Sequence, residues 1–121
     1  MTVDAPRRRV LLVEDETIIA MMMEEMLADL GYDVAEIAAQ IETAHRAAEK
    51  GAFDLAILDL NLGGAPTYPV AEILQARRIP FVFSTGYDSD GLAPRYAQTP
   101  MLRKPFEYED LRALMSRIFA A

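Results

Sequence analysis

The sequence predicts an α/β fold in which parallel strands alternate with helices. Short apolar runs rich in β-branched residues recur along the chain, and the segments between them carry apolar residues at helical spacing. A parallel strand is covered by helices on both faces, so its residues are apolar throughout rather than alternately. With 121 residues, 52% of them apolar, the chain has the size and the hydrophobic content of one domain.

Five segments are expected to form the strands of one sheet. They comprise residues 10–13, 33–37, 55–58, 81–83 and 101–103. The first, third and fourth are plain apolar runs. The second is weaker and follows Gly31, a residue type that commonly ends helices, and the fifth is a short run bracketed by Pro100 and Pro105.

Four segments are expected to be helices: residues 18–30, 41–50, 68–77 and 111–118. The apolar residues of the first recur at intervals of three and four: Ile18, Ile19, Met22, Met23, Met26, Leu27 and Leu30. We expect this methionine-rich stripe to pack into the core. In segment 88–99, Gly91 and Pro94 interrupt any helix, so a weak or distorted fourth helix is expected there.

Strands joined by helical crossovers predict a doubly wound sheet with helices on both faces. The common small solution is the flavodoxin-like order 2-1-3-4-5, whose ligand site lies beyond the carboxyl ends of the strands. Residues 1–8 are expected to be a flexible flank of this single domain, and no output domain is expected within residues 1–121.

The acidic balance of the chain argues against nucleic acid and anionic membranes as partners. Nineteen Asp and Glu residues against 12 Lys and Arg residues give a net charge of −7, which repels phosphate groups. The basic run at residues 7–9 is interpreted as a solvated flank. No apolar stretch approaches the roughly 20 residues that span a membrane, and the absence of cysteine excludes disulfides and thiolate metal sites. A cytoplasmic protein is expected.

Polar residues follow the expected strands at their carboxyl ends. Glu14 and Asp15 follow the first strand, Asp59 the third, Thr85 the fourth and Lys104 the fifth. If the sheet order holds, these side chains converge on one pocket. Clustered carboxylates resist ionising together unless a cation neutralises them, and ligands that are all oxygen favour a hard ion such as Mg²⁺ or Mn²⁺.

A hard cation, an ammonium group, a hydroxyl and an accessible carboxylate are the parts needed to transfer a phosphoryl group to aspartate. In this interpretation Asp59 attacks the phosphorus atom. Lys104 and the metal neutralise the phosphoryl oxygens, and Thr85 donates a hydrogen bond to one of them.

The motifs VLLVEDE, LAILDLNLGG, FVFSTG and LRKPF, in this order and spacing, resemble those of CheY-like response-regulator receiver domains. The resemblance implies that Asp59 is the phosphoacceptor and that Thr85 and Lys104 bind the phosphoryl group. It also implies a Mg²⁺ site made by Asp15, by Glu14 through water, by Asp59 and by the backbone carbonyl of Asn61. The implied phosphodonor is a sensor histidine kinase, and the domain catalyses only its own phosphorylation and slow dephosphorylation.

Residues 83–87, Phe-Ser-Thr-Gly-Tyr, resemble a narrower subgroup of single-domain bacterial receivers linked to general stress signalling. Most receivers place Tyr or Phe three residues before the lysine, and this chain has Met101 there. The aromatic residue of the usual switch is therefore missing, and the candidates for the switch are Thr85, Gly86, Tyr87 and Met101. Phosphorylation is expected to order segment 88–99.

These features predict a stand-alone response regulator that signals by binding another protein or by acting as a phosphate sink, as a monomer or a weak dimer. One alternative is a receiver-like binding module that is never phosphorylated. A second is an aspartate-based hydrolase, although Asn61 stands where such enzymes carry a second acid. A third is a flavin-binding module, although the acidic turn after the first strand repels an unneutralised phosphate.

Overall fold

The computed structural model describes residues 7–86 and 92–119, and a five-stranded parallel sheet forms its centre. The strands of this sheet are β1 (Arg9–Val13), β2 (Asp33–Ala38), β3 (Leu55–Asp59), β6 (Phe81–Thr85) and β7 (Met101–Arg103). Their order is β2-β1-β3-β6-β7, and each neighbouring pair is parallel. Counted along the chain this order is 2-1-3-4-5, so the predicted topology is confirmed.

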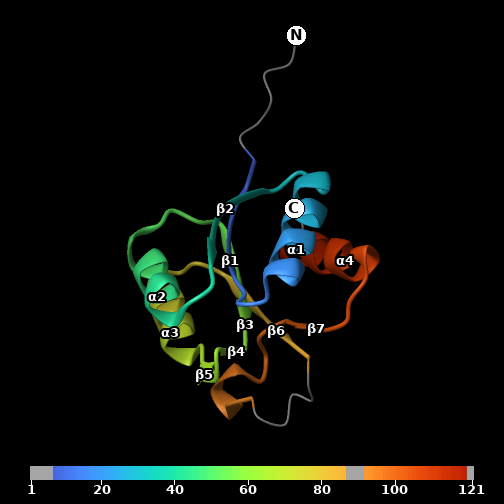
Figure 1. Cartoon of the computed structure of the whole chain (residues 1–121). Helices are drawn as coiled ribbons and strands as arrows, with labels where there is room; N and C mark the ends of the chain where they lie inside the picture. The colour runs from blue at the N-terminus through green and yellow to red at the C-terminus, as the bar shows by residue number, and fades with distance from the viewer. Residues whose placement is uncertain (1–6, 87–91, 120–121) are drawn as a thin grey trace.

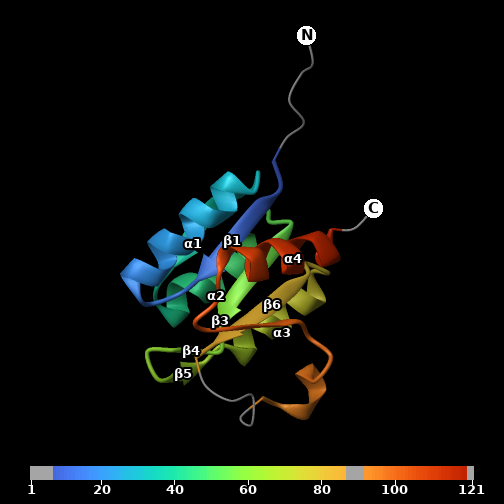
Figure 2. The same ribbon diagram turned by 90° about the vertical axis from the view of Figure 1, so that its right-hand side faces the viewer.

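Helices cover both faces of the sheet. α1 (Thr17–Asp29) and α4 (Tyr108–Ile118) lie on one face, and α2 (Ile41–Lys50) and α3 (Tyr68–Ala76) lie on the other (Figures 1 and 2). A separate hydrophobic cluster fills the space on each side. All the residues of the central strand β3 are buried, which explains its continuous apolar run. α4 begins earlier than its apolar spacing suggested, because Glu107 and Asp110 form a capping box.

The predicted apolar stripe of α1 is wrong at two positions. Ile18 is 79% exposed and Met22 is 42% exposed, whereas the residues that enter the core are Ala20, Met23 and Leu27. Successive helical residues are rotated by about 100° around the axis, which places Ile18 and Met22 on the side away from the sheet. The exposed Met21 adjoins them, so the first half of α1 presents apolar side chains at the surface.

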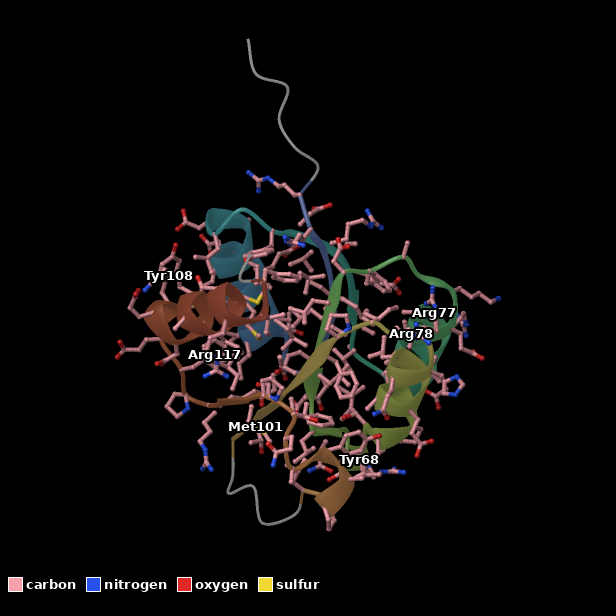
Figure 3. All side chains as sticks on the ribbon, turned by 180° about the vertical axis from the view of Figure 1, so that it is seen from behind. Tyr68, Arg77, Arg78, Met101, Tyr108 and Arg117 are labelled. Carbon is pink, nitrogen blue, oxygen red and sulfur yellow. The ribbon has the colours of Figure 1, made fainter. Side chains whose placement is uncertain are left out.

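No α-helix lies between β6 and β7 among residues 81–86 and 92–103, where the structure describes the chain. Residues 92–99 contain only a 3₁₀ helix, Pro94–Tyr96, in agreement with the expected distortion, and the predicted switch residue Tyr87 lies outside the described residues. The Tyr96 ring is buried and stacks on that of Tyr68 with centroids 5.2 Å apart, and the ring of Phe83 meets it edge-on at 5.4 Å. Figure 3 shows Tyr68 near the short helix of this segment. Aromatic side chains therefore hold this short segment against α3 and the sheet.

The two described residues of the predicted flank contact the rest of the chain. The Arg7 guanidinium donates a hydrogen bond to the Ala28 carbonyl at 3.2 Å, and the Arg8 guanidinium lies 4.1 Å from the centre of the Phe119 ring. Residues 1–6 of the flank lie outside the described part of the chain.

A short hairpin follows β3 and leads into α3. Its strands β4 (Asn61–Leu62) and β5 (Ala65–Pro66) pair antiparallel. Gly63 and Gly64 form the tip with φ angles of +58° and +86°, a region that glycine adopts without steric cost. The hairpin lies at the edge of the sheet where the parallel strands end (Figure 1).

Candidate functional site

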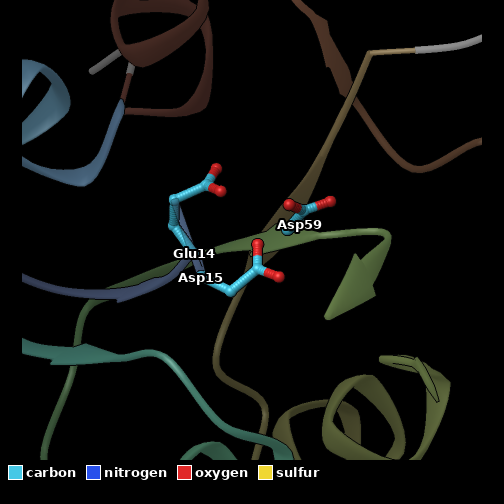
Figure 4. A group of neighbouring side chains, drawn as sticks. All are labelled: Glu14, Asp15 and Asp59. Atoms are coloured by element: carbon cyan, nitrogen blue, oxygen red, sulfur yellow. The ribbon is translucent and has the colours of Figure 1, made fainter. Parts of the chain in front are cut away.

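Three carboxylates meet at the carboxyl edge of the sheet. Glu14 and Asp15 directly follow β1, and Asp59 is the last residue of the neighbouring strand β3. Each offers one carboxylate oxygen, and these oxygens lie within 4.8 Å of one another (Figure 4). Glu14 is 2% exposed and Asp59 is 9% exposed, whereas Asp15 lies at the surface. The predicted convergence of the acidic residues is therefore present in the structure.

Lys104 supplies a positive charge inside this cluster. β7 runs level with β6, so the residue that follows β7 comes beside the end of β6. Its ammonium nitrogen lies 2.6 Å from Glu14 Oε1 and 3.2 Å from Asp59 Oδ2, and its side chain is 12% exposed. The ammonium group thus bridges the two buried carboxylates with charge-assisted hydrogen bonds.

Burial and pairing shift the ionisation of this group in identifiable ways. Burial raises the pKa of Glu14 above its usual value, although the hydrogen bonds from Lys104 and from the Glu16 amide oppose the shift. Burial alone would lower the pKa of Lys104, but its bonds and charge interactions with Glu14 and Asp59 outweigh that effect and raise it. Lys104 therefore stays charged at neutral pH.

Backbone amides of the hairpin hold two of the carboxylates. The Asn61 amide donates to Asp59 Oδ1 at 3.2 Å, and the Gly63 amide donates to Asp15 Oδ2 at 3.0 Å. The hairpin therefore connects acidic residues that come from different strands of the sheet.

The cluster opens into a cavity of about 560 Å³. Asp15, Asp59 and Lys104 line it, together with Thr85 and Gly86 at the end of β6. Ile19, Met22 and Phe106 form an apolar part of its wall. The cavity is larger than a phosphoryl group and a metal ion require, so it leaves room for part of a donor molecule beside them.

Most residues predicted for the site come together here. Lys104 binds Glu14 and Asp59, and Asp15 lies beside these two carboxylates. Asn61, Thr85 and Gly86 line the adjoining cavity. Met101 does not line this cavity; it is half-buried among the aromatic residues on the α2 and α3 side of the sheet.

Sequence reasoning missed two contributors to the site. The Gly63 amide holds Asp15, and the Gly63-Gly64 pair after Asp59 was a signal for a tight turn but not for that bond. The fully buried Thr67 donates its hydroxyl hydrogen to the Asp59 carbonyl oxygen at 2.7 Å. A threonine at the start of a helix predicts a cap, and nothing in the sequence indicated a bond back to the strand.

The donor set suits a hard divalent cation. Within the described residues, the grouped ligands are three carboxylates, and two of them, Glu14 and Asp59, share the Lys104 ammonium group. Oxygen ligands at the mouth of a cavity fit Mg²⁺ or Mn²⁺ and do not suit the metals that prefer thiolate or imidazole.

Comparisons with known proteins identify the family to which this chain is similar. The family model for the response regulator receiver domain matches residues 10–116. SdrG from Sphingomonas melonis Fr1 is 39% identical, and its solution structure superposes with a TM-score of 0.83 over 94% of this chain and 98% of that chain. The BeF3-activated conformation of SdrG, from Pseudomonas melonis Fr1, gives a TM-score of 0.80 at 39% identity over 93% of this chain and 96% of that chain.

Other relatives include PhyR and PdtaR. The PhyR receiver domain from Erythrobacter litoralis is 31% identical, with a TM-score of 0.80 over 92% of this chain and 88% of that chain. A further PhyR structure, named as a stress response regulator, is 29% identical with a TM-score of 0.78 over 93% of this chain and 45% of that chain. The transcriptional regulatory protein PdtaR of Mycobacterium tuberculosis is 33% identical over 108 residues, which are 86% of this chain and 53% of PdtaR. The chain spans about half the length of the curated relatives it matches.

Each helix in the described part of the chain is too short or too polar to cross a lipid bilayer.

Proposed function

Because the chain belongs to the response regulator receiver domain family, we propose that it is a response regulator that accepts a phosphoryl group on Asp59 from a histidine kinase in a Mg²⁺-dependent reaction. Membership in this family places the chain in two-component signalling. The observation that carries the specific assignment is the setting of Asp59: its carboxylate lines the cavity, with Lys104 on one oxygen and the Asn61 amide on the other.

The proposed transfer uses groups that line the cavity. An Asp59 oxygen attacks the phosphorus atom while the bond from phosphorus to the kinase histidine nitrogen breaks, so the phosphoryl group changes carrier and nothing is oxidised or reduced. Asp15, Asp59 and the Asn61 carbonyl would hold Mg²⁺, with Glu14 acting through water, and the ion would neutralise charge on the phosphoryl oxygens. The chain catalyses only its own phosphorylation, and water then slowly cleaves the aspartyl phosphate, which restores the Asp59 carboxylate and releases inorganic phosphate.

The Lys104 ammonium group would bind the phosphoryl group as well as its two carboxylate partners. Its ammonium group bonds to Glu14 and Asp59 before transfer, and a phosphoryl group on Asp59 adds strong acceptor oxygens within its reach. The Thr85 hydroxyl and the Gly86 amide, on the same wall of the cavity, would bind the remaining oxygens. These contacts would restrain the end of β6 and with it the segment that leads to Tyr96.

The exposed apolar residues of α1 are a docking surface for the kinase in this proposal. Ile18, Met21 and Met22 are exposed, and Met22 also lines the cavity, so a partner seated on them can reach Asp59. The acidic residues Glu16 and Glu25 flank this surface. We expect a partner helix with an apolar stripe and basic residues beside it, because apolar contact supplies affinity and complementary charge supplies orientation.

The similarity to SdrG and PhyR supports a place in stress signalling. In this proposal the chain signals through protein–protein binding or acts as a phosphate sink.

Intact-mass spectrometry with acetyl phosphate and Mg²⁺ tests the proposal. The wild-type chain should gain the mass of one phosphoryl group, and Asp59→Asn should gain none. Asp33→Asn is the matched control, because Asp33 is an exposed aspartate at the amino end of β2 and should leave phosphorylation unchanged. A wild-type chain that gains no mass would instead be a receiver-like binding module, and an Asp59→Asn chain that still gains it would place the acceptor elsewhere.

A further inference from the structure

Thr67 has an unusual position for a residue that begins a helix. It stands at the N-cap of α3, where a threonine side chain ordinarily accepts a hydrogen bond from an amide of the first turn. Its side chain makes no such bond. The hydroxyl instead donates to the Asp59 carbonyl oxygen at 2.7 Å, and the Leu60 carbonyl oxygen lies 3.3 Å away.

The same residue closes the loop that carries the hairpin. The Thr67 amide donates to the Leu60 carbonyl at 3.1 Å, so both the amide and the hydroxyl of Thr67 bind the chain that leaves β3. On its other side, the Thr67 carbonyl accepts the amides of Val70 and Ala71 at the start of α3. Thr67 is fully buried, so water does not compete for these bonds.

The loop closed in this way holds the carboxylates of the site. Asn61 and Gly63 lie inside it, and their amides bind Asp59 and Asp15. The Asp59 carbonyl belongs to the peptide that joins Asp59 to this loop, so a bond to that oxygen fixes the direction in which both the side chain and the loop leave the strand.

We propose that Thr67 is a positioning residue that fixes Asp59 for phosphoryl transfer and fixes the hairpin for metal binding. This inference rests on the proposed function of Asp59. The hydroxyl acts through the backbone of Asp59 and touches neither the metal nor the phosphoryl group. When a residue that hydrogen-bonds to a metal ligand is mutated, the metal affinity or the activity commonly falls by about 10- to 100-fold.

The test compares the full chain with three variants. Thr67→Val keeps the shape of the side chain and removes the hydroxyl, and Thr67→Ser restores the hydroxyl. Val70→Ala is the matched control, because Val70 is fully buried on the same helix and its truncation destabilises the fold without touching the hydroxyl. Two quantities are measured below the melting temperature of every variant: the rate constant for phosphorylation by acetyl phosphate, and the Kd for Mg²⁺ from the NMR shift of the Gly63 amide.

Thr67→Val should lower the rate constant by about tenfold and weaken Mg²⁺ binding severalfold, and Thr67→Ser should restore both to within about twofold of wild type. Val70→Ala should melt at a lower temperature with both quantities unchanged. If the valine methyl group prevents folding, Thr67→Ala removes the hydroxyl without placing a methyl group against the two carbonyls.

Two results would overturn the inference: wild-type rate and Mg²⁺ affinity in folded Thr67→Val, or losses that Thr67→Ser does not rescue. A wild-type chain that accepts no phosphoryl group would end the proposed function instead. In that case the Mg²⁺ titration alone decides the role of Thr67, and equal Kd values for wild type and Thr67→Val refute it.

Discussion

Replacing Lys104 by Met removes the ammonium group while keeping an unbranched apolar stem of the same length as the lysine stem. In the wild type this group lies 2.6 Å from Glu14 and 3.2 Å from Asp59. The Glu14 side chain is 1% exposed and that of Asp59 12%. Without Lys104, two neighbouring carboxylates remain at a buried position with no cation between them. The variant should therefore be less stable than the wild type at pH 7 without Mg²⁺.

The expected loss is about 3 kcal/mol in the free energy of unfolding. Removing one member of a buried ion pair commonly costs about 3 to 5 kcal/mol, and the lower end applies because Asp59 and Lys104 reach the cavity. For a domain of this size, a loss of about 3 kcal/mol lowers the melting temperature by about 10 °C. Mg²⁺ should restore part of it, because the cation binds the carboxylates of the folded state only.

The stability lost in Lys104→Met should become smaller as the pH falls. Burial raises the pKa of Glu14, and the Lys104 hydrogen bond opposes that shift, so the pKa of Glu14 rises further in the variant. A carboxyl group whose pKa is higher in the folded state binds more protons when folded, so acidification stabilises the fold. As the pH falls from 7 toward 4.5, the ordinary pKa of a glutamate, the difference in the free energy of unfolding between variant and wild type should therefore shrink.

Urea unfolding followed by far-ultraviolet circular dichroism, at several pH values and with and without Mg²⁺, measures these differences. Lys50→Met is the matched control, because Lys50 is the other lysine of the chain and lies exposed at the end of α2. The control should lose less than about 0.5 kcal/mol at every pH. The reasoning is refuted if Lys104→Met is as stable as the control at pH 7, or if its deficit grows as the pH falls.

Three further predictions concern α1, the aromatic cluster and the segment beyond β6. Ile18→Ser should change the free energy of unfolding by less than about 0.5 kcal/mol, and it should slow phosphoryl transfer from the cognate kinase but not from acetyl phosphate. Met23→Ala, at a buried position of the same helix, should instead lower the free energy of unfolding by about 2 to 5 kcal/mol. Equal rates of transfer from the kinase to Ile18→Ser and to the wild type would remove α1 from docking. Among the described residues the buried Tyr96 hydroxyl has no hydrogen-bond partner, so Tyr96→Phe should raise the free energy of unfolding by about 1 kcal/mol in urea titrations, and a loss would reveal a partner. Amide hydrogen exchange in residues 92–99 should slow when beryllium fluoride binds, and unchanged exchange would contradict ordering of this segment.

The topology and the content of the site could be predicted from the sequence because both depend on local patterns. Strands that are buried on both faces are apolar throughout, as in β3, and helical crossovers between parallel strands leave few ways to order them. Once the order is known, residues such as Asp59 and Lys104, which come at the carboxyl ends of strands, must lie at one edge of the sheet. Residue type then indicates the chemistry, because carboxylates and an ammonium group suit a divalent cation and a phosphoryl group.

The tertiary structure decided which apolar residues of α1 enter the core and which groups form hydrogen bonds to the carboxylates and backbone of the site. The apolar residues of α1 cover more than half of the helix circumference, and contact with the sheet selected Met23 for the core and left Ile18 outside. The Gly63 amide binds an Asp15 carboxylate that lies 48 residues away, and the Thr67 hydroxyl turns back to a carbonyl of the preceding strand instead of capping its own helix. A pattern fixes the period of an element, but the direction of a single hydroxyl or amide depends on the packing around it.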